Sequence, residues 1–533
     1  MLLRNTSWIV TVASAVLLRS TSAPAEGAGP ERTFCVSEYG AAGTGKTLDT
    51  RAIQRAIDAC NAAGGGTVYL GPGDYLSGTI FLKSNVRVYL EAGAVLRGSP
   101  RAQDYAKIPR TNIRGQPAFP GGFLVFGDGV QNAAIEGRGT IDGQGPAFWH
   151  PEKVNHFVKK PMVTRPRALV CVVKGSGLRF RDVSLVNSPC YTLWLIGCDN
   201  VTIDAVTIRN PHDGPNTDGI DVDCCRSVRI SNCHIEGGDD AIALKSDSGT
   251  LGEDMPCEDV TVTNCTLCSV PACGVRIGYE GDAVIRNCTF SNLAIFDTDI
   301  GLDIVSILPN RPEFTILKGT RCENIVFENI TMRNVNRAIF FWLGNETGGD
   351  TQASMNNVRV SNVIAESRIG SVVIGYPKKK IENVMLSNIH LTLTATMPEK
   401  ATLSGSQIWG GDWNPYAMYC SWIDGLRVDD LSIDLRRASG SWRHAVYCEK
   451  VDGAEITALR TRGLDVKNGA VPIGLTNTTA TIRGCSAEAG ATAFLKATSG
   501  SQASVHGCDL TAARGGLLID KSSAASAFAN RSP

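Results

Sequence analysis

The stretch that decides the fold is NTDGIDVDCCRSVRISNCHIEGGDDAIALKS, residues 216–246. Two segments in it, GIDVD and DAIALK, alternate apolar and polar residues, which predicts short half-buried strands. Aligning the two patterns places Asp240 on Asp218, because 240 − 218 = 22 residues. One coil of a parallel β-solenoid takes about 20 to 30 residues, and adjacent coils lie about 4.8 Å apart. We therefore expect Asp218, Asp239 and Asp240 at one edge of two successive coils.

Carboxylates stacked this closely cannot all stay ionised at ordinary cost. Such a cluster holds a shared proton or has one raised pKa, which is what paired acid and base catalysis requires. The residues alone therefore indicate a candidate catalytic edge.

The same phrase recurs along the chain: a polar residue, a short β-branched strand, an Asn and another apolar pair. Clear copies begin at Asp199, Arg226, Glu258, Glu323, Asn356 and Glu382, and weaker copies at Asp452, Thr478 and Ser501. The interval is 27 residues before the second copy (226 − 199) and 32 after it (258 − 226). This variation predicts an all-β solenoid with loops of uneven length. We expect each Asn to be a stacked turn residue that satisfies backbone groups inside the coil.

A helix is predicted just after the start of the repeats. Asp49 or Thr50 can cap it, and it would run to about Cys60. Counted from Ile53, the apolar residues Ala56, Ile57 and Cys60 follow at spacings of three, four and seven, which puts them on one helical face. A helix in this place would cover the open end of the solenoid, whose terminal coil otherwise exposes its core.

The chain is expected to form one long domain, because a repeat architecture grows by adding coils. Residues 34–100 would form the N-terminal cap and first coils, residues 101–395 the central β-helix, and residues 396–533 further coils and a C-terminal tail. Lys and Arg equal Asp and Glu at 52 each, which gives no electrostatic case for nucleic acid or an anionic membrane. We expect a monomer.

Residues 1–26 are predicted to be a signal peptide. Arg4 is the positive region, Trp8–Leu18 is an apolar run too short to span a bilayer, and small residues follow at Ser22–Ala25. A signal-anchor is the alternative, because Arg19 interrupts the run. We expect a secreted or periplasmic protein without membrane contact after cleavage.

The 18 cysteines invite a disulfide interpretation in an exported chain. However, Cys233, Cys265 and Cys288 occupy equivalent places in the repeat, and stacked side chains point the same way. We expect a ladder of buried free thiols that act as small apolar residues, with a few disulfide bridges elsewhere.

Two aromatic-rich segments interrupt the coils, Phe148–Lys160 (with Trp149, His150 and His156) and Gln407–Trp422 (with Trp409, Trp413, Tyr416 and Tyr419). Loops of this kind are where a substrate would be held. Their rings could stack on pyranose rings, or they could simply pack against the side of the solenoid.

Four motifs in order resemble glycoside hydrolase family 28, the polygalacturonase and rhamnogalacturonan hydrolase family. They are EYGAAGTGKTLDTRAIQRAID with the following GGTVYLGPGDYLSGTIFLKSNVRVYLEAGAVLRGS, then EGRGTIDGQG with FW at 148–149, NTDG at 216–219, and GGDD at 237–240. The likeness covers roughly residues 34–395. It implies a single-stranded right-handed parallel β-helix that hydrolyses a glycosidic bond in pectin with inversion, without metal or cofactor.

Site roles follow from the resemblance. Asp239, the first Asp of GGDD, would be the general acid. Asp218 and Asp240 would hold and deprotonate the attacking water, with Asn216 beside them. This matches the requirement of inversion for one protonated and one ionised carboxyl. The alternative for Asp218 and Asp240 is that they cap turns or bind calcium.

Two departures from the family pattern stand out. Where polygalacturonases carry GHG, this chain has Ala272-Cys273-Gly274, so Cys273 takes the His position in the column of Asp218 and Asp240. Where they carry Arg-Ile-Lys, the segment GLDIV places Asp303 and Val305. An acidic residue there is expected to repel a galacturonate carboxylate.

A replacement cation is predicted one coil earlier. In CGVRIG, Arg276 aligns with the column of Asp221, with Asp303 next above it, and Lys245 lies in the neighbouring column. We hypothesise that Arg276 and Lys245 supply the cationic contact to a carboxylate or to sugar hydroxyls, with Asp221 and Cys273 in the same binding site. The alternative is that Arg276 only pairs with Asp303 or Asp221.

The sequence thus predicts a hydrolase for an acidic plant-type polysaccharide, with exo-action or rhamnogalacturonan favoured over endo-action on homogalacturonan. Two other functions stay open. A pectate-lyase-type β-elimination would need calcium and a basic Arg or Lys and would give an unsaturated product. A non-catalytic carbohydrate-binding solenoid would release no new reducing ends.

Overall fold

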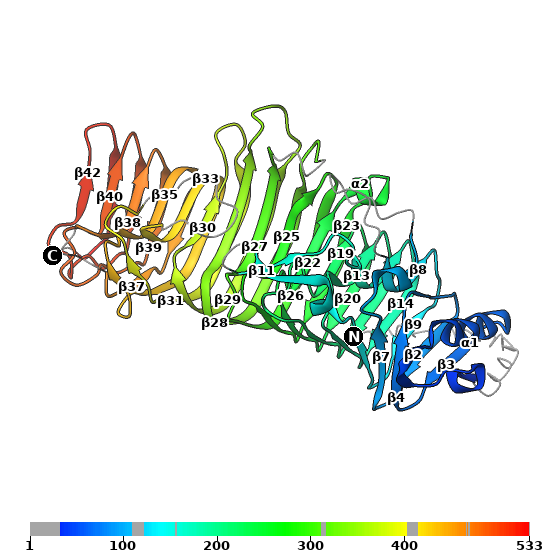
Figure 1. Cartoon of the computed structure of the whole chain (residues 1–533). Coiled ribbons are helices and arrows are strands. Elements are labelled where there is room, and N and C mark those ends of the chain that lie inside the picture. The colour runs from blue at the N-terminus through cyan, green and yellow to red at the C-terminus, as the bar shows by residue number, and fades with distance from the viewer. Residues whose placement is uncertain are drawn as a thin grey trace, which may run out of the picture.

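The computed structural model describes residues 32–108, 122–154, 157–310, 316–401, 414–464, 466 and 469–531. These residues form a right-handed parallel β-helix, as predicted, with helix α1 (Thr50–Ala62) over its N-terminal end and β42 (Leu517–Ile519) near the other end (Figure 1). The predicted signal peptide, residues 1–26, lies outside the described residues. None of the helices described is long and apolar enough to cross a bilayer.

The strands stack into ladders A, B and C, one for each side of the coil, and every pairing within these ladders is parallel. The strands of ladder A are β5 (Ile80–Phe81), β8 (Phe123–Asp128), β13 (Ala168–Val173), β16 (Tyr191–Ile196), β19 (Ile220–Asp223), β22 (Ile242–Ser246), β25 (Cys273–Gly281), β27 (Ile300–Leu308), the end of β28 (Arg321–Asn345), β30 (Ser371–Ile374), the start of β33 (Tyr416–Asp434), β35 (His444–Asp452), β38 (Val471–Thr476), β40 (Leu495–Thr498) and β42. Ladder A carries the candidate acids, which lie just before two of its strands, β19 and β22.

Ladders B and C complete each coil and share several long strands. Ladder B holds β1 (Thr33–Cys35), β3 (Gly66–Leu70), β6 (Val86–Leu90), β9 (Ala134–Glu136), β14 (Ser176–Arg181), β17 (Asp199–Asp204), β20 (Arg226–Ser231), β23 (Cys257–Thr263), β26 (Val284–Phe296), β28, β29 (Ser354–Ile369), β31 (Ile381–Leu393), β33, β36 (Ala454–Thr457), β39 (Thr479–Arg483), β41 (Gln502–His506) and β43 (Ala524–Phe528). Ladder C holds β2 (Thr44–Leu48), β4 (Gly73–Ser77), β7 (Ala94–Gly98), β10 (Thr140–Asp142), β15 (Ser184–Val186), β18 (Thr207–Arg209), β21 (His234–Gly237), β24 (Thr266–Ser269), parts of β26, β28, β29, β31 and β33, and β37 (Arg460–Arg462).

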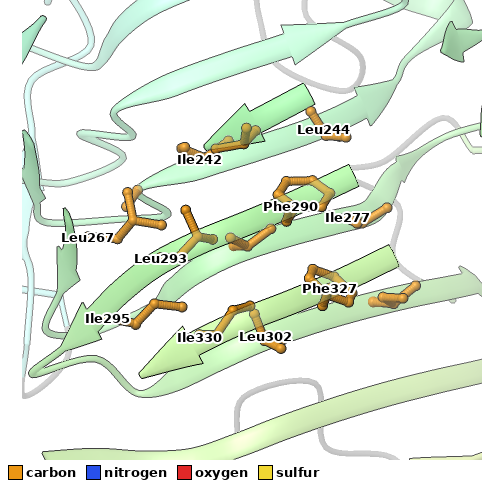
Figure 2. Packing of buried hydrophobic residues seen from close by; sticks show 14 of the residues in the cluster. Ile242, Leu244, Leu267, Ile277, Phe290, Leu293, Ile295, Leu302, Phe327 and Ile330 are labelled. Carbon is orange, nitrogen blue, oxygen red and sulfur yellow. The ribbon is translucent and has the colours of Figure 1, made fainter. Parts of the chain in front are cut away.

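The core is filled by side chains that stack coil on coil. Phe327 stacks on Phe290 of the preceding coil, with ring centroids 5.0 Å apart, and also packs against Phe341 of its own coil at 5.9 Å; all three rings are fully buried. Figure 2 shows Phe290 beside Phe327, and Leu293 paired with Ile330 in the same two coils. In-register pairing puts equivalent apolar positions of successive repeats above one another, so the sequence repeat becomes a continuous core.

The Asn residues of the repeat stack at an outer turn. Asn329 has a φ of 56°, a left-handed conformation that Asn tolerates. Its amide donates to Asn292 Oδ1 (3.2 Å) and its Oδ1 accepts from Asn362 (3.0 Å). Stacking was predicted correctly, but these amides bond one another at the surface rather than backbone groups inside the coil.

Helix α1 differs from the prediction in its cap. Asp49 precedes the first turn, but its carboxylate accepts from the backbone N–H groups of Ala42 (2.7 Å) and Gly43 (3.1 Å) instead of from the helix. The buried face of α1, which includes Ile53 and Ile57, packs against the first coils, as a cap requires.

All 18 cysteines are free thiols, and all except Cys35 are buried. Cys233, Cys265 and Cys288 each donate to the carbonyl two residues earlier, at 3.2 Å. The predicted ladder of buried thiols is confirmed. The disulfide bridges predicted elsewhere are not formed.

Candidate active site

The register of ladder A brings the acids together. Ile220 pairs with Ile242 and Ile242 with Val275, so Asp218, Asp240 and Cys273 follow one another in one column, as predicted. The GGDD turn approaches the loop before Asp218 so closely that a Cβ on Gly238 would lie 2.5 Å from a backbone oxygen of Gly214. The Gly238 N–H donates to Thr217 Oγ1 (3.0 Å), which fixes this turn.

Carboxylate oxygens of Asp218, Asp239 and Asp240 all lie within 4.8 Å of one another. Burial and the neighbouring Asp240 charge raise the pKa of Asp239 to about 7. Burial, then the charges of Asp221 and Asp239, raise the pKa of Asp218 well above its usual range. The cluster therefore retains protons near neutral pH, as expected for like charges at this spacing.

Arg276 is the cation in contact with Asp240. Its Nε lies 2.8 Å from Asp240 Oδ2 and its Nη2 lies 3.2 Å from Asp303 Oδ2. Nη2 also donates to Cys273 Sγ at 3.1 Å. The side chain is only 5% exposed, so these groups, and not solvent, surround the guanidinium. This arrangement favours the pairing alternative for Arg276, with Asp303 as partner and Asp240 as a second one.

Lys245 is likewise held by carboxylates. Its Nζ lies 2.7 Å from Glu280 Oε2, 2.9 Å from Asp221 Oδ1 and 3.6 Å from Asp218 Oδ2. It also lies 4.4 Å from the ring centroid of Tyr191. With 6% of its side chain exposed, Lys245 balances the charge of the acids rather than reaching outward.

Three expectations need correction because the side chains concerned are fully buried. Asp221 and Cys273 were expected among the substrate-binding residues, but each is 0% exposed. Asp221 instead holds Lys245, and the Cys273 backbone N–H donates to Asp240 Oδ1 (3.1 Å). Asp303 was expected to repel a substrate carboxylate. It too is 0% exposed, pairs with Arg276 and accepts from the Cys273 thiol (3.2 Å).

These buried groups set the proton content of the site. Burial raises the pKa of Asp303 to about 7 although the Arg276 charge lowers it. Burial also raises the pKa of Asp221 to about 6, against the opposing charge of Lys245. Burial, followed by the charges of Asp303 and Asp240, keeps the Cys273 thiol neutral by raising its pKa well above the ordinary value, although Arg276 lowers it.

Sequence reasoning missed several residues of this site. Tyr191 lies one coil before Asp218 in the same column, and Arg167 stacks over its ring at 4.5 Å. Arg165 Nη2 donates to Asn216 Oδ1 (2.8 Å), which fixes the exposed Asn216 in the loop before Asp218. Extending the alignment back from Asp218 by one coil reaches Tyr191, and by two coils reaches TRPRALV, residues 164–170, which holds Arg165 and Arg167.

Glu280 had no such signal. Leu244 of β22 pairs with Ile277 of β25, but Ser246 pairs with Gly281, so β25 has extra residues between these two pairs. Glu280 lies among them, and its position cannot be found by counting alternate residues. Tyr279, just before it, has a φ of 65°. The bulge turns Glu280 toward Lys245. Burial is the largest single influence and raises the pKa of the Glu280 carboxyl, but the charge and hydrogen bond of Lys245 and the charges of Arg167 and Arg276 together lower it overall.

Comparison with known proteins identifies the family. The model of glycosyl hydrolases family 28 matches residues 72–407, which is more than half of the chain. The chain belongs to glycosyl hydrolases family 28. It is therefore a glycosidase, as its carboxylate cluster predicts.

Individual relatives of this family 28 chain are distant. It is 27% identical over 380 residues to a probable polygalacturonase of Vitis vinifera, which covers 67% of this chain and 74% of the relative. It is 27% identical over 363 residues to an endo-polygalacturonase of Pectobacterium carotovorum subsp. carotovorum, covering 65% of this chain and 85% of the relative. The solved structure of a hyperthermoactive exopolygalacturonase from Thermotoga maritima shares the fold, with a TM-score of 0.57 and 22% identity over 68% of this chain and 88% of that one.

One aromatic segment of this family 28 enzyme lies beside the acids. Strands β11 (Trp149–Lys153) and β12 (Lys159–Pro161) form an antiparallel hairpin. The Lys159 N–H donates to the Asp213 carbonyl (2.8 Å), and Trp149 Nε1 donates to the Pro189 carbonyl (3.0 Å). Trp149 is thus a packing residue, while His156 lies outside the described residues.

The acid triplet is also the one group of described residues that could hold a metal ion. Calcium takes six to eight oxygen ligands in such sites. Here Arg276 already contacts Asp240 and Lys245 stands 3.6 Å from Asp218, so two fixed cations occupy the place of a metal charge. The expectation of catalysis without a metal or other cofactor stays a prediction.

Proposed function

We propose that the chain is a secreted or periplasmic hydrolase that cleaves glycosidic bonds in pectic polysaccharide, with galacturonan or rhamnogalacturonan as the substrate class. The observation that carries this proposal is the convergence of Asp218, Asp239 and Asp240 within 4.8 Å, where burial and like charges raise the pKa of both Asp239 and Asp218. Membership of family 28 and the polygalacturonase names of its relatives support the substrate class.

Asp239 is proposed as the general acid. It is less buried than Asp218 and Asp240, and its raised pKa leaves a proton available for the leaving glycosidic oxygen. Its Oδ1 accepts the Asp240 N–H at 2.9 Å, which orients the carboxyl. Asp240 and Asp218 are proposed to hold and deprotonate the attacking water. Arg276 Nε contacts Asp240 Oδ2 at 2.8 Å and would hold that carboxyl in place beside the water.

Inversion at the anomeric carbon is part of the proposal and rests on the family resemblance. The two carboxyl groups of inverting glycosidases usually stand about 6.5–9.5 Å apart. The oxygens here approach within 4.8 Å, so the water would sit beside the carboxylates rather than in a wide gap between opposed ones. Proton NMR of the first product measures this directly. A retained anomer would contradict inversion and indicate direct attack by a carboxylate.

Exo-action or action on rhamnogalacturonan is proposed over endo-action on homogalacturonan. The support is the exchange of the family His for Cys273 and of the family Arg and Lys for Asp303 and Val305. Arg276 and Lys245 are already paired with acids inside the site. A uronate carboxylate would therefore have to be recognised by an exposed cation near the acids. Lys160, exposed on the β12 hairpin, is the one we propose for this contact.

The test is a reducing-end assay on homogalacturonan, rhamnogalacturonan and their oligomers, with chromatography of the products, beside the variant Asp239→Asn. We expect wild-type release of saturated products from one of these substrates and a loss of about 10²–10⁴-fold in the variant. An unsaturated product that absorbs in the ultraviolet would instead indicate β-elimination. Binding without new reducing ends from any substrate would indicate a carbohydrate-binding solenoid.

A further inference from the structure

The columns of ladder A that carry the acids continue into the C-terminal coils. Asp303 pairs with Phe340, Phe340 with Val372, and Val372 with Tyr419. Tyr419 pairs with Tyr447, which is followed by Gly474 and then Lys496. Figure 1 shows these strands, from β25 through β30, β33, β35, β38 and β40, side by side along the same face of the solenoid.

Four rings gather on this face at β33 and β35. Tyr416 lies 4.3 Å from Tyr447, 5.7 Å from Tyr419 and 5.7 Å from His444, measured between ring centroids, and its plane is within 21° of all three. Tyr416 and Tyr447 are only partly buried, so part of their surface is open to solvent. We call Tyr416, Tyr419, His444 and Tyr447 the aromatic platform. Trp409 and Trp413 of the same predicted aromatic segment lie outside the described residues.

A hollow of about 370 Å³ lies against the platform. Gly474 lines this hollow, and the rings leave no room for a side chain there, since a Cβ would come within 2.6 Å of the His444 ring and 2.7 Å of the Tyr447 ring. The floor is polar as well as aromatic, because the Tyr447 hydroxyl and Thr476 Oγ1 lie 2.7 Å apart. The hollow is lined by Tyr416, Arg443, His444, Tyr447, Gly469, Gly474, Leu475, Thr476, Lys496 and Thr498.

The charges around this hollow favour an anion. Arg443 and Lys496 are both exposed at its edge, and none of the described residues lining it is acidic. Glu449 on β35 is engaged by the Tyr419 hydroxyl (2.8 Å) and by Lys450 Nζ (3.8 Å). Burial lowers the pKa of His444 to about 4, and the charges of Lys496 and Arg443 lower it too, so both cations act at the same place.

We propose that the aromatic platform, with Arg443 and Lys496, is a second binding site for an acidic polysaccharide, separate from the site of hydrolysis. The platform rings would stack on the apolar face of a sugar ring, and the two cations would pair with its carboxylates. That the ligand is a uronate polymer rests on the proposed function; the site itself follows from the rings, the hollow and the charges. It lies beyond the residues that the family model matches.

The placement fits a polymer and not a short product. Tyr447 is five coils from Arg276 along the ladder, and adjacent strands lie about 4.8 Å apart, so the two sites are separated by about 24 Å. Between them lies a buried apolar cluster that includes Phe340, Trp342 and Val372. A disaccharide cannot reach both sites, whereas a long chain can, so the platform would raise the local concentration of polymer at the acids.

The kinetic test compares polygalacturonate with digalacturonate for the double variant Arg443→Ala/Lys496→Ala. Two exposed ion pairs of about 0.5 kcal/mol each predict that the polymer-to-dimer ratio of kcat/KM falls about 5-fold. The matched control, Lys46→Ala/Arg51→Ala, removes two exposed cations at the N-terminal end of the solenoid, one on β2 and one on the capping helix α1, and is expected to leave the ratio unchanged. Circular dichroism checks that both variants fold. An unchanged ratio in the platform variant would overturn the proposal.

A binding test separates the platform from the hydrolytic function. Calorimetric titration of the Asp239→Asn chain with hexagalacturonate is expected to show two sites, and the same titration with the platform substitutions added is expected to show a loss of about 5-fold in the affinity of one of them. If no pectic substrate is hydrolysed but this loss is seen, the platform stands and the proposed function fails. If substrate is hydrolysed but the titration is unchanged, the platform fails and the function stands. Equal binding of neutral maltohexaose would overturn the assignment to an acidic ligand.

Discussion

The sharpest prediction concerns Arg276→Met, which keeps the length of the side chain and removes its charge. The guanidinium contacts Asp240 (2.8 Å) and Asp303 (3.2 Å), and the three side chains are at most 8% exposed. Removing the cation of a buried pair leaves the acids uncompensated, which costs about 3–5 kcal/mol in the free energy of unfolding. The loss should exceed that of an ordinary surface substitution several-fold.

The loss should depend on pH in a stated direction. The pKa values of Asp239 and Asp303 are raised to about 7 from 3.8, mainly by burial, and Arg276 lowers both. A carboxyl with a raised folded pKa stabilises the fold below its ordinary value, and this contribution is lost as the pH rises through the folded pKa. Without Arg276 both values rise further, so we expect the larger loss at pH 8 and a smaller one at pH 5.

The assay is urea unfolding followed by tryptophan fluorescence at both pH values. The companion double variant Arg276→Met/Asp303→Asn also removes the charge of Asp303, one of the two acids that Arg276 contacts. It should recover on the order of 1–2 kcal/mol of the lost free energy of unfolding, the coupling expected of contacting residues. Equal losses at pH 5 and pH 8, or no recovery in the double variant, would refute the assignment of Arg276 as the cation that balances this cluster.

Four further outcomes are expected. The wild-type kcat should fall as the pH rises through about 7, because Asp239 must carry its proton; a flat profile to pH 9 would remove Asp239 as the acid. Phe327→Ala, packed against two rings, should cost about 3–5 kcal/mol in urea unfolding. The exposed Ile364→Ala should cost under about 0.5 kcal/mol, and similar values for the two would contradict the core assignment. Asn329→Ala should cost about 1–2 kcal/mol because alanine resists a φ of 56°, whereas Asn329→Gly should cost less; the reverse order would show that the amide bonds dominate. A thiol-reactive dye should modify at most Cys35 in the folded chain and all 18 thiols after denaturation, and fewer in the denatured chain would reveal disulfides.

Much of the fold could be predicted because the strand register of a solenoid follows from the repeat in its sequence. The alternation in GIDVD and DAIALK aligns Asp240 with Asp218, and the same alignment places Arg276 between Asp221 and Asp303 along the column. Each coil repeats a local pattern, so a long-range contact follows from counting residues along the chain. The same logic predicted the ladder of buried thiols, whereas the capping helix was predicted from apolar residues at helical spacings.

The roles of the cations could not be predicted in this way. A column shows which residues are neighbours, but it does not show how deeply they are buried. Asp303 and Asp221 looked able to meet a substrate, yet both are fully buried and hold Arg276 and Lys245. Glu280 escaped notice because a bulge breaks the alternation that locates every other residue of the cluster.

The sequence by itself determined the coil, the stacking of like positions and the meeting of Asp218, Asp239 and Asp240, because in-register pairing is a local and repeated rule. Only the tertiary structure decided which charged side chains are buried in ion pairs and which are exposed to solvent. Burial and ion pairing depend on all neighbours at once, and they set the pKa values of the acids. They also distinguish the paired Arg276 from the exposed Arg443 and Lys496 at the far end of the same face.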